Sequence, residues 1–260
     1  MADWISFTTD YGLADGFVAA CTGVIARIAP HARVIDVTHL VPPQDIRRGA
    51  TVLAQTVPFL PAAVHLAVVD PGVGTARRAV VLDTPGGPLV GPDNGLLVPA
   101  AEALGGVRAA HRLTDPRYRL PTVSATFHGR DLFAPAAAHL AAGTRPDQFG
   151  PAVDPHTLVR LPDPETTGTP DELSTEVLSV DRFGNLQLAA TGSHLDALPG
   201  RVRLGAHEAV VGRTFGDAPA GDLVVYVDSS GQAAVAVNGG SAADRLGAAP
   251  GDKLTLTAIR

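Results

Sequence analysis

The stretch WISFTTDYGLADGFVAACTGVIARIAPHARVIDV, residues 4–37, contains the pattern that decides the fold class. Trp4–Thr8 is an apolar run typical of a buried strand, and Val34–Val37 is a second one. Between them, Gly16–Ile28 has the spacing of an amphipathic helix, whose apolar face is formed by Phe17, Cys21, Val24, Ile25 and Ile28. A strand, a helix and a second strand in this order indicate a layered α/β domain whose sheet is at least partly parallel.

The same alternation continues through the first half of the chain. Ile46–Val57 has helical spacing, and His65–Val69 and Ala79–Leu82 are short β-branched runs typical of strands. Asp131–Ala142 predicts a further helix, and Pro135 is compatible with it because an amide in the first helical turn has no intrahelical partner to lose. We therefore predict an N-terminal α/β domain over residues 1–160, with strands alternating with helices.

The pattern changes after this domain. Six prolines fall between Arg145 and Leu173 with little periodicity, so we predict a Pro-rich linker over residues 161–173. Residues 174–260 contain short glycine-punctuated runs with strand character and predict a smaller, all-β barrel domain. The expected strands are Glu176–Val180, Leu186–Ala190, Arg201–Leu204, Ala209–Val211, Leu223–Val227, Ala233–Val237 and Leu254–Ala258.

Composition limits the classes of partner. The formal net charge is −6, which argues against nucleic acid or an anionic membrane surface as the main partner, because both favour basic proteins. Cys21 is the single cysteine, so neither an intrachain disulfide nor a cysteine-built metal site is possible. The N-terminal MADWISFTTDYG lacks the pattern of a secretory signal, and no apolar run approaches the roughly 20 residues of a membrane span. These features predict a cytoplasmic protein.

Acidic or polar groups fall where the strands of the first domain are expected to end. They are Asp10 and Asp15, Asp45, Asp70 with Arg77, and Asp93 with Asn94. Open α/β sheets bind ligands at the carboxyl ends of their strands, so these clusters favour a polar pocket for a cationic or hydroxyl-rich ligand. Taken singly, each cluster is also explained by the ordinary use of Asp and Asn in turns and caps.

Other motifs are weaker by themselves. His128 in FHGRDLF precedes an expected helix start, but a lone histidine is more often structural than catalytic, and Arg130 with Asp131 is also explained as a surface pair. No zinc-type histidine spacing, Walker A loop or dinucleotide fingerprint is present, so no metal is predicted. In the second domain, DRFGN and VNGGSA read by chemistry alone as turns.

The motifs acquire a different meaning as a set. In order along the chain they are TTDYGLADGF, VVDPGVGTARR, GPDNGLL, FHGRDLFAPAAAHLA, SVDRFGN and SSGQAAVAVNGGSA. From about Ile5 to Leu256 this set closely resembles the S-adenosyl-L-methionine (SAM) hydroxide adenosyltransferase family, the SAM hydrolases, which are related to the SAM-dependent fluorinases and chlorinases.

The resemblance implies an N-terminal α/β domain and a C-terminal β-barrel in a homotrimer whose sites lie between the domains of neighbouring subunits. It also implies hydrolysis of SAM to adenosine and L-methionine, with SAM as the substrate and no cofactor. The family's catalytic Asp, Arg and His match Asp70, Arg77 and His128. Chemistry agrees with these roles: a carboxylate can take the proton of an attacking water, and a permanently cationic guanidinium can hold that carboxylate in place.

The substrate-binding residues implied by the resemblance come from both domains. Asp10 matches the residue that holds the ribose hydroxyls, and Asp15 and Asp181 match groups around the methionine ammonium. The adenine region and the methionine carboxylate match the set Phe183, Asn185, Asn238, Gly239 and Ser229. Ser230 stands where the fluorinase has an arginine, and Phe17 where it has a serine, so the contacts with the methionine tail are expected to differ.

Three alternatives remain open from the sequence. A SAM-dependent halogenase is disfavoured because Asp70, where the halogenases have a tyrosine, would repel a halide. The halogenases also lack the histidine that matches His128, whereas Gly129, which matches the halide-binding serine of the fluorinase, does not decide. A non-catalytic SAM- or nucleoside-binding module would leave the set Asp70, Arg77 and His128 unexplained. A metallohydrolase that uses Asp10, Asp15, Asp70 and His128 would lose its activity in a strong chelator.

Overall fold

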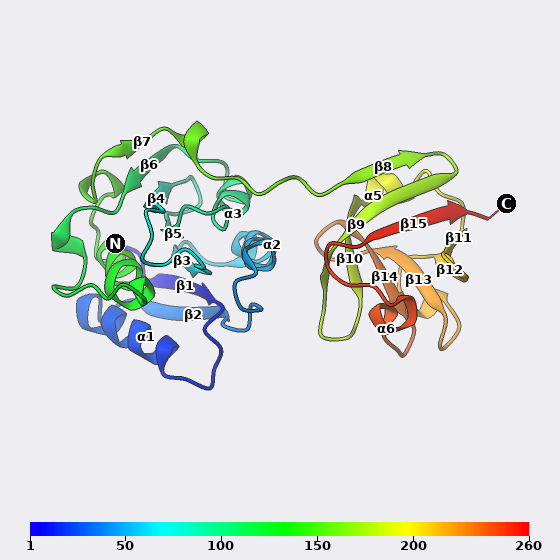
Figure 1. Ribbon diagram of the computed structural model, residues 1–260, viewed down its shortest axis with the longest axis horizontal. Helices are drawn as coiled ribbons and strands as arrows, with labels where there is room; N and C mark the ends of the chain where they lie inside the picture. Colours follow the sequence, from blue (N-terminus) through cyan, green and yellow to red (C-terminus); the bar gives the residue numbers. More distant parts are fainter. Residues whose placement is uncertain (260) are drawn as a thin grey trace. The chain divides into compact units, whose positions relative to one another are not determined.

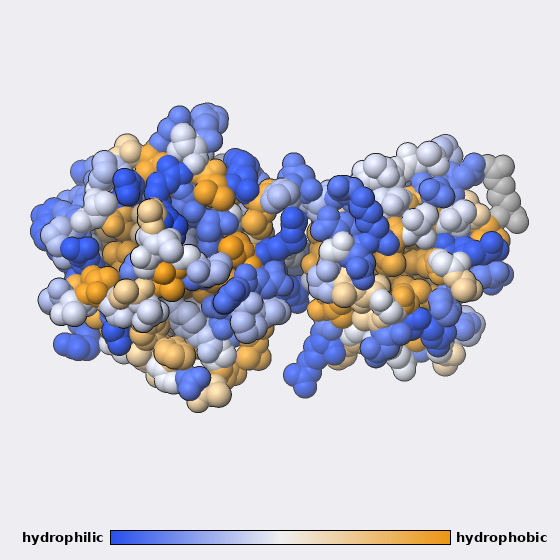
Figure 2. Space-filling view, in the orientation of Figure 1, coloured by the Kyte–Doolittle hydropathy of each residue, from blue (hydrophilic) through white to orange (hydrophobic). Residues whose placement is uncertain are grey.

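A computed structural model describes residues 1–259 and divides the chain into two compact units, Met1–Leu161 and the part that begins at Pro162 (Figure 1). Each unit has its own hydrophobic core, and each is described by itself. On the face drawn in Figure 2, apolar residues are interspersed with polar ones over both units. Over the described residues, no helix combines the length and the apolar character that a membrane crossing requires.

The first unit is built on a seven-stranded mixed sheet in the order β2-β1-β3-β5-β4-β6-β7. Its parallel half contains β2 (Arg33–Thr38), β1 (Trp4–Thr9), β3 (Val64–Val68) and β5 (Leu89–Pro92). Its antiparallel half adds β4 (Ala79–Asp83), β6 (Ala109–Arg112) and β7 (Ala152–Val153). The predicted α/β class with a partly parallel sheet is therefore confirmed.

Two helical layers cover the sheet, because the side chains of each strand alternate between its faces. Leu66 and Val68 of β3 belong to the core cluster that contains α1 (Phe17–Ile28) and α4 (Ala134–Ala141). Ala67, between them in sequence, belongs to a second cluster with α2 (Ile46–Thr56) and α3 (Val98–Ala103). The continuous apolar run of β3 follows from burial on both faces.

The helix predicted over Asp131–Ala142 begins differently in the structure. A π-helical turn, Gly129–Phe133, comes first, and regular α4 follows with Pro135 in its first turn. Shorter 3₁₀ turns occur at Val57–Phe59, Pro116–Tyr118, Pro146–Gln148, Pro155–Thr157 and Phe215–Asp217. Because π turns arise from tertiary contacts as well as local propensity, the periodicity of the sequence predicts the helix but not this widened start.

The second unit is a closed seven-stranded β-barrel, as predicted (Figure 1). Around the ring the strands are β9 (Glu172–Val180), β10 (Leu186–Thr191), β14 (Gln232–Val237), β13 (Leu223–Val227), β12 (His207–Val211), β11 (Arg201–Leu204) and β15 (Lys253–Ala258). Pairing of β15 with β9 closes the ring. Two short helices, α5 (Gly192–Leu195) and α6 (Ala242–Leu246), complete the unit.

An additional strand, β8 (Thr166–Thr169), pairs with the first half of β9. Both β8 and the start of β9 lie within residues 161–173, the range in which the sequence predicts a linker. Thr166 and Thr175 are paired across this hairpin, and their hydroxyl oxygens are 3.0 Å apart. Residues 166–173 are therefore part of the sheet that forms the barrel.

A buried histidine predicts acid sensitivity of the first unit. His65 on β3 is 1% exposed, lies 2.8 Å from the Ser6 hydroxyl through Nδ1, and has a pKa lowered to about 4 by burial. Between this value and the unfolded value of about 6.5, the unfolded chain binds more protons, so the free energy of unfolding falls as the pH falls. The full loss is about 3 kcal/mol, reached below the folded pKa.

Urea unfolding measured at several pH values checks this prediction. We expect His65→Gln to flatten the dependence of the unfolding free energy on pH between about 6.5 and 4, whereas His156→Gln, at an exposed position, retains the wild-type dependence. Equal pH dependence in His65→Gln and the wild type would contradict the assignment of acid sensitivity to His65.

Candidate active site

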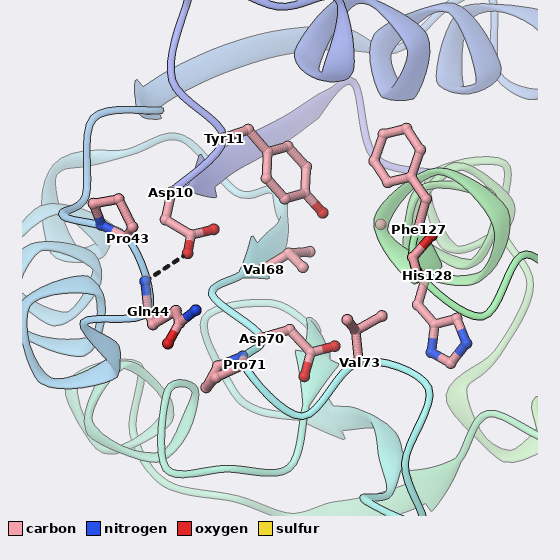
Figure 3. A pocket seen from close by; sticks show the side chains of 12 residues that line it. Asp10, Tyr11, Pro43, Gln44, Val68, Asp70, Pro71, Val73, Phe127 and His128 are labelled. Atoms are coloured by element: carbon pink, nitrogen blue, oxygen red, sulfur yellow. Dashed lines mark hydrogen bonds between the residues drawn. The ribbon is translucent and has the colours of Figure 1, made fainter.

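A cavity of about 290 Å³ opens at the carboxyl ends of β1, β2 and β3 (Figure 3). Parallel strands end at the same edge of a sheet, so loops that are distant in sequence meet there. The lining residues are Asp10, Tyr11, Pro43, Gln44, Val68, Asp70, Pro71, Val73, Thr126, Phe127, His128 and Gly129. The expectation of a polar pocket at this edge is met by two of the acidic residues, Asp10 and Asp70.

The Asp70 carboxylate is held by Arg77. Arg77 Nε lies 3.0 Å from Asp70 Oδ1 and 3.1 Å from Oδ2, and a terminal guanidinium nitrogen also donates to Oδ2. The two side chains are largely buried, at 5% exposure for Asp70 and 11% for Arg77. The guanidinium also stacks over the Phe133 ring, with its carbon 5.1 Å from the ring centroid. This pair is therefore a shielded and geometrically fixed group, unlike an exposed surface ion pair.

His128 completes this group. Arg77 donates to its Nδ1 at 2.8 Å from the terminal nitrogen that also donates to Asp70. A guanidinium nitrogen has no lone pair to offer, so Nδ1 must be the acceptor and the neutral ring carries its proton on Nε2. Burial and the positive charge of Arg77 lower the pKa of His128, which favours the same neutral form at pH 7.

A glycine fixes the loop that places Asp70 and Arg77. Gly74 has a positive φ of 77°, and a Cβ there would lie 2.3 Å from the carbonyl oxygen of Ala125. Any side chain would therefore separate the loop after β3 from the segment that leads to His128. Gly74 of the VVDPGVGTARR motif thus allows the loop that carries Asp70 and Arg77 to approach the segment that carries His128.

Asp10 occupies the other end of the cavity. Its Oδ2 accepts a hydrogen bond of 2.9 Å from the amide of Gln44, drawn as a dashed line in Figure 3. Gln44 is the non-glycine residue with positive φ (67°) among the described residues. A strained backbone of this kind persists only where the surroundings enforce it. Here it aims a backbone donor at Oδ2 of Asp10.

The remaining strand-end residues have structural roles in the first unit. Asp45 accepts from the Arg48 amide and caps α2, and Asp93 pairs with Arg78 and accepts from the Val159 amide. Asn94 donates to the carbonyl oxygen of Val69 at 2.8 Å. Asp15 is exposed in the loop before α1 and lies outside the cavity lining.

The candidate residues of the second unit lie in three turn regions. Asp181 accepts from the amides of Phe183 and Asn185 and from the Asn185 side chain, so its carboxylate shapes the β9–β10 turn. Phe183 at the tip is 75% exposed. Ser229 lies in the β13–β14 turn.

Asn238 and Gly239 follow β14, and the Asn238 side chain donates to the Ala218 carbonyl. Gly239 has a positive φ of 82°, a backbone conformation that glycine adopts readily.

Comparison with known protein families identifies the family of this chain. The family model described as the SAM hydroxide adenosyltransferase N-terminal domain matches residues 5–150, and that of the C-terminal domain matches residues 175–255. The chain belongs to the SAM hydroxide adenosyltransferase family. The resemblance inferred from the motifs is confirmed.

Individual relatives agree with this assignment. A protein of Salinispora arenicola (strain CNS-205) named (R)-S-adenosyl-L-methionine hydrolase is 66% identical over 98% of each chain. A crystal structure of an uncharacterized conserved protein from Thermotoga maritima superimposes with a TM-score of 0.89 at 36% identity, covering 97% of this chain and 99% of that one. A fluorinase of Actinoplanes sp. (strain N902-109) is 28% identical over 90% of each chain. The chain is thus also similar to fluorinases, at lower identity.

Some residues that line the cavity were not predicted from the sequence. Tyr11, Gln44, Thr126 and Phe127 line the cavity but were not among the predicted site residues. Tyr11 and Phe127 are adjacent to the predicted Asp10 and His128, so adjacency to a motif was the available signal. Gln44 directly precedes Asp45, another strand-end candidate, but its positive φ is revealed only by the folded backbone.

Proposed function

We propose that this chain hydrolyses S-adenosyl-L-methionine to adenosine and L-methionine. The observation that carries the proposal is the buried carboxylate of Asp70, fixed by Arg77 at the wall of the cavity. The names of the relatives support the substrate. The reaction needs a nucleophile and little else, because the sulfonium already activates C5′ and methionine leaves as a neutral thioether.

The proposed chemical step is an in-line displacement. The oxygen of a water attacks C5′ of SAM, the C5′–S bond breaks, and its electron pair passes to sulfur. The attacking water gives one proton to Asp70, which acts as the general base and later releases that proton to solvent. Configuration at C5′ is inverted.

His128 acts through Arg77 in this proposal. While Nδ1 accepts from Arg77 it is not free to take a proton from water, so the assignment of the base to Asp70 is the simpler one. The imidazole positions the guanidinium, and the guanidinium positions Asp70. The residue is thus a positioning residue whose neutral form is the active one.

Substrate binding is proposed to use residues of both units. Asp10 holds the ribose hydroxyls through its carboxylate, since a carboxylate accepts strongly from hydroxyl donors. From a neighbouring subunit of a homotrimer, Phe183, Asn185, Asn238 and Gly239 receive the adenine, and Ser229 receives the methionine carboxylate. Asp15 and Asp181 lie near the methionine ammonium.

The shared site requires the homotrimer. Light scattering measures the mass of the protein in solution, and a fully active monomer would refute the shared site.

The stereochemistry of the substrate follows from the relative's name. It specifies the (R) form, and because "L" already fixes the amino-acid centre, (R) describes the sulfonium sulfur. We propose the same preference here. Incubation with an epimeric mixture of SAM should deplete the (R) epimer first.

The reaction type is tested by incubating the protein with SAM in ¹⁸O-labelled water and analysing the nucleoside by mass spectrometry. Label in the adenosine 5′-hydroxyl fixes both the nucleophile and the bond that breaks. Recovery of the (R) epimer of SAM intact, or formation of a 5′-halo nucleoside that depends on added halide, would overturn the proposal.

Variants of His128 give a pH-dependent prediction. Because burial and Arg77 lower the pKa of His128, we expect kcat/KM to be constant at neutral pH and to fall only below the ordinary histidine value of about 6.5. Protonation there removes the acceptor and places a cation against Arg77 and beside the carboxylates of Asp70 and Asp131.

His128→Asn, which keeps an acceptor near the Nδ1 position, should retain more activity than His128→Leu and should move the acid limb of the profile to lower pH. An unchanged acid limb in His128→Asn would show that another group titrates.

A further inference from the structure

Tyr11 brings a hydroxyl group into the cavity from the loop after β1. Its ring packs edge-on against Phe127, with centroids 5.7 Å apart, and is tilted against Phe17 at 6.1 Å. Figure 3 shows the hydroxyl turned toward the same space as the Asp70 carboxylate. The aromatic neighbours fix the ring, so the position of its oxygen is determined by the fold.

The hydroxyl lies directly against Gly129. A Cβ on residue 129 would be 1.9 Å from the Tyr11 oxygen and 2.9 Å from the ring carbon that bears it, so even alanine could not be accommodated without displacement of Tyr11. Gly129 opens the π-helical turn and follows His128 directly. The missing side chain of Gly129 thus makes room for the phenol, and Tyr11 and Asp70 both line the cavity.

The hydroxyl is neutral and unused by the protein. Burial, together with the negative charges of Asp10 and Asp70, raises the pKa of Tyr11 well above its ordinary value, so the phenol stays protonated at all physiological pH values. Within residues 1–259, the hydrogen bond that Tyr11 makes runs from its backbone amide to Thr9 Oγ1, at 3.2 Å. Its oxygen therefore bounds the cavity as an unpaired polar group.

We propose that Tyr11 is a specificity-determining residue that restricts the nucleophile site beside Asp70 to a single water. The phenol oxygen occupies the volume that the carbon of a larger oxygen nucleophile would need. Exclusion by size complements Asp70, which repels anions but not a neutral alcohol. The inference rests on the proposed function and adds to it a selection among neutral nucleophiles.

Methanol is the probe that tests this selection, because it differs from water by one methyl group. If admitted, its oxygen attacks C5′, the C5′–S bond breaks toward sulfur, and its proton passes to Asp70, giving 5′-O-methyladenosine and methionine. The ratio of this ether to adenosine is an internal competition, so it does not depend on how fast a variant turns over.

We expect Tyr11→Phe, which removes one heavy atom and keeps the ring contacts, to raise the ratio of ether to adenosine at fixed methanol concentration. The increase should be about tenfold or more, the usual worth of one methyl group in a fitted pocket. Tyr11→Leu should raise the ratio further. Tyr118→Phe is the matched control, since that ring packs on His139 and Phe149 outside the cavity lining.

Outcomes separate this inference from the proposed function. If the wild type forms adenosine and the ratio of ether to adenosine is the same in the wild type, Tyr11→Phe and Tyr11→Leu, the proposed role of Tyr11 is overturned. SAM hydrolysis itself would stand. Loss of hydrolysis in the wild type itself would overturn both.

Melting temperatures test the contact independently of turnover. Gly129→Ala should lower Tm, and adding Tyr11→Leu should recover part of that loss, because it removes the atoms that clash. Strictly additive effects would contradict the contact between residues 11 and 129.

Discussion

Asp70→Asn is expected to lower kcat by about 10²- to 10⁴-fold, the range for loss of a general base. The asparagine amide matches the carboxylate in size but cannot take a proton from the attacking water. Because Asp10, assigned to the ribose, is untouched, we expect the affinity for SAM to change far less than kcat. Single-turnover rates and calorimetric binding to SAM measure the two effects separately.

The matched control is Asp115→Asn. Asp115 is also paired with an arginine, 2.7 Å from Arg117, but this pair lies outside the cavity lining. Wild-type turnover is expected in the control. Wild-type turnover in Asp70→Asn would remove Asp70 from the chemistry and favour a reaction in which unassisted water attacks.

Arg77→Met is expected to impair both activity and folding. It removes the donor that serves Asp70 and His128 together and leaves a carboxylate with 5% exposure without its partner. Loss of one member of a buried pair costs about 3–5 kcal/mol of unfolding free energy. Methionine retains much of the apolar stem that packs on Phe133, so the loss reflects the missing charge and hydrogen bonds. Urea unfolding and steady-state kinetics measure the two effects.

Two further variants isolate the role of Arg77. Arg77→Lys keeps the charge but not the planar fork, so it should recover stability more fully than activity. Arg117→Met removes the exposed partner of Asp115 and should leave activity at the wild-type level. If Arg77→Lys restored full kcat, the bridging geometry between Asp70 and His128 would be unnecessary.

Comparison of the strand-end carboxylates shows where sequence reasoning succeeded and where it stopped. Asp10, Asp45, Asp70 and Asp93 all follow expected strands and are equivalent as sequence patterns. The structure turns Asp10 and Asp70 into the cavity, whereas Asp45 caps α2 and Asp93 binds Arg78. The family resemblance selected Asp10 and Asp70. The residues alone did not, because an aspartate that caps a helix and one that faces a ligand have the same local surroundings in sequence.

Adjacent arginines make the same point. Arg77 pairs with Asp70 and Arg78 with Asp93, although nothing in the motif TARR distinguishes them. Each arginine pairs with the carboxylate toward which its side chain projects from the loop, and that direction is set by the folded backbone. The positive φ of Gln44 and the contact of Tyr11 with Gly129 were invisible for the same reason.

The amino-acid sequence by itself determined the two-part architecture, the alternation of strands and helices, and the barrel strands, because hydrophobic periodicity and glycine or proline punctuation act over a few neighbouring residues. Tertiary structure alone decided which groups meet: Arg77 and His128, 51 residues apart, and Tyr11 and Gly129, which are even more distant along the chain. Such contacts depend on how whole elements pack against one another, and local pattern does not encode that packing.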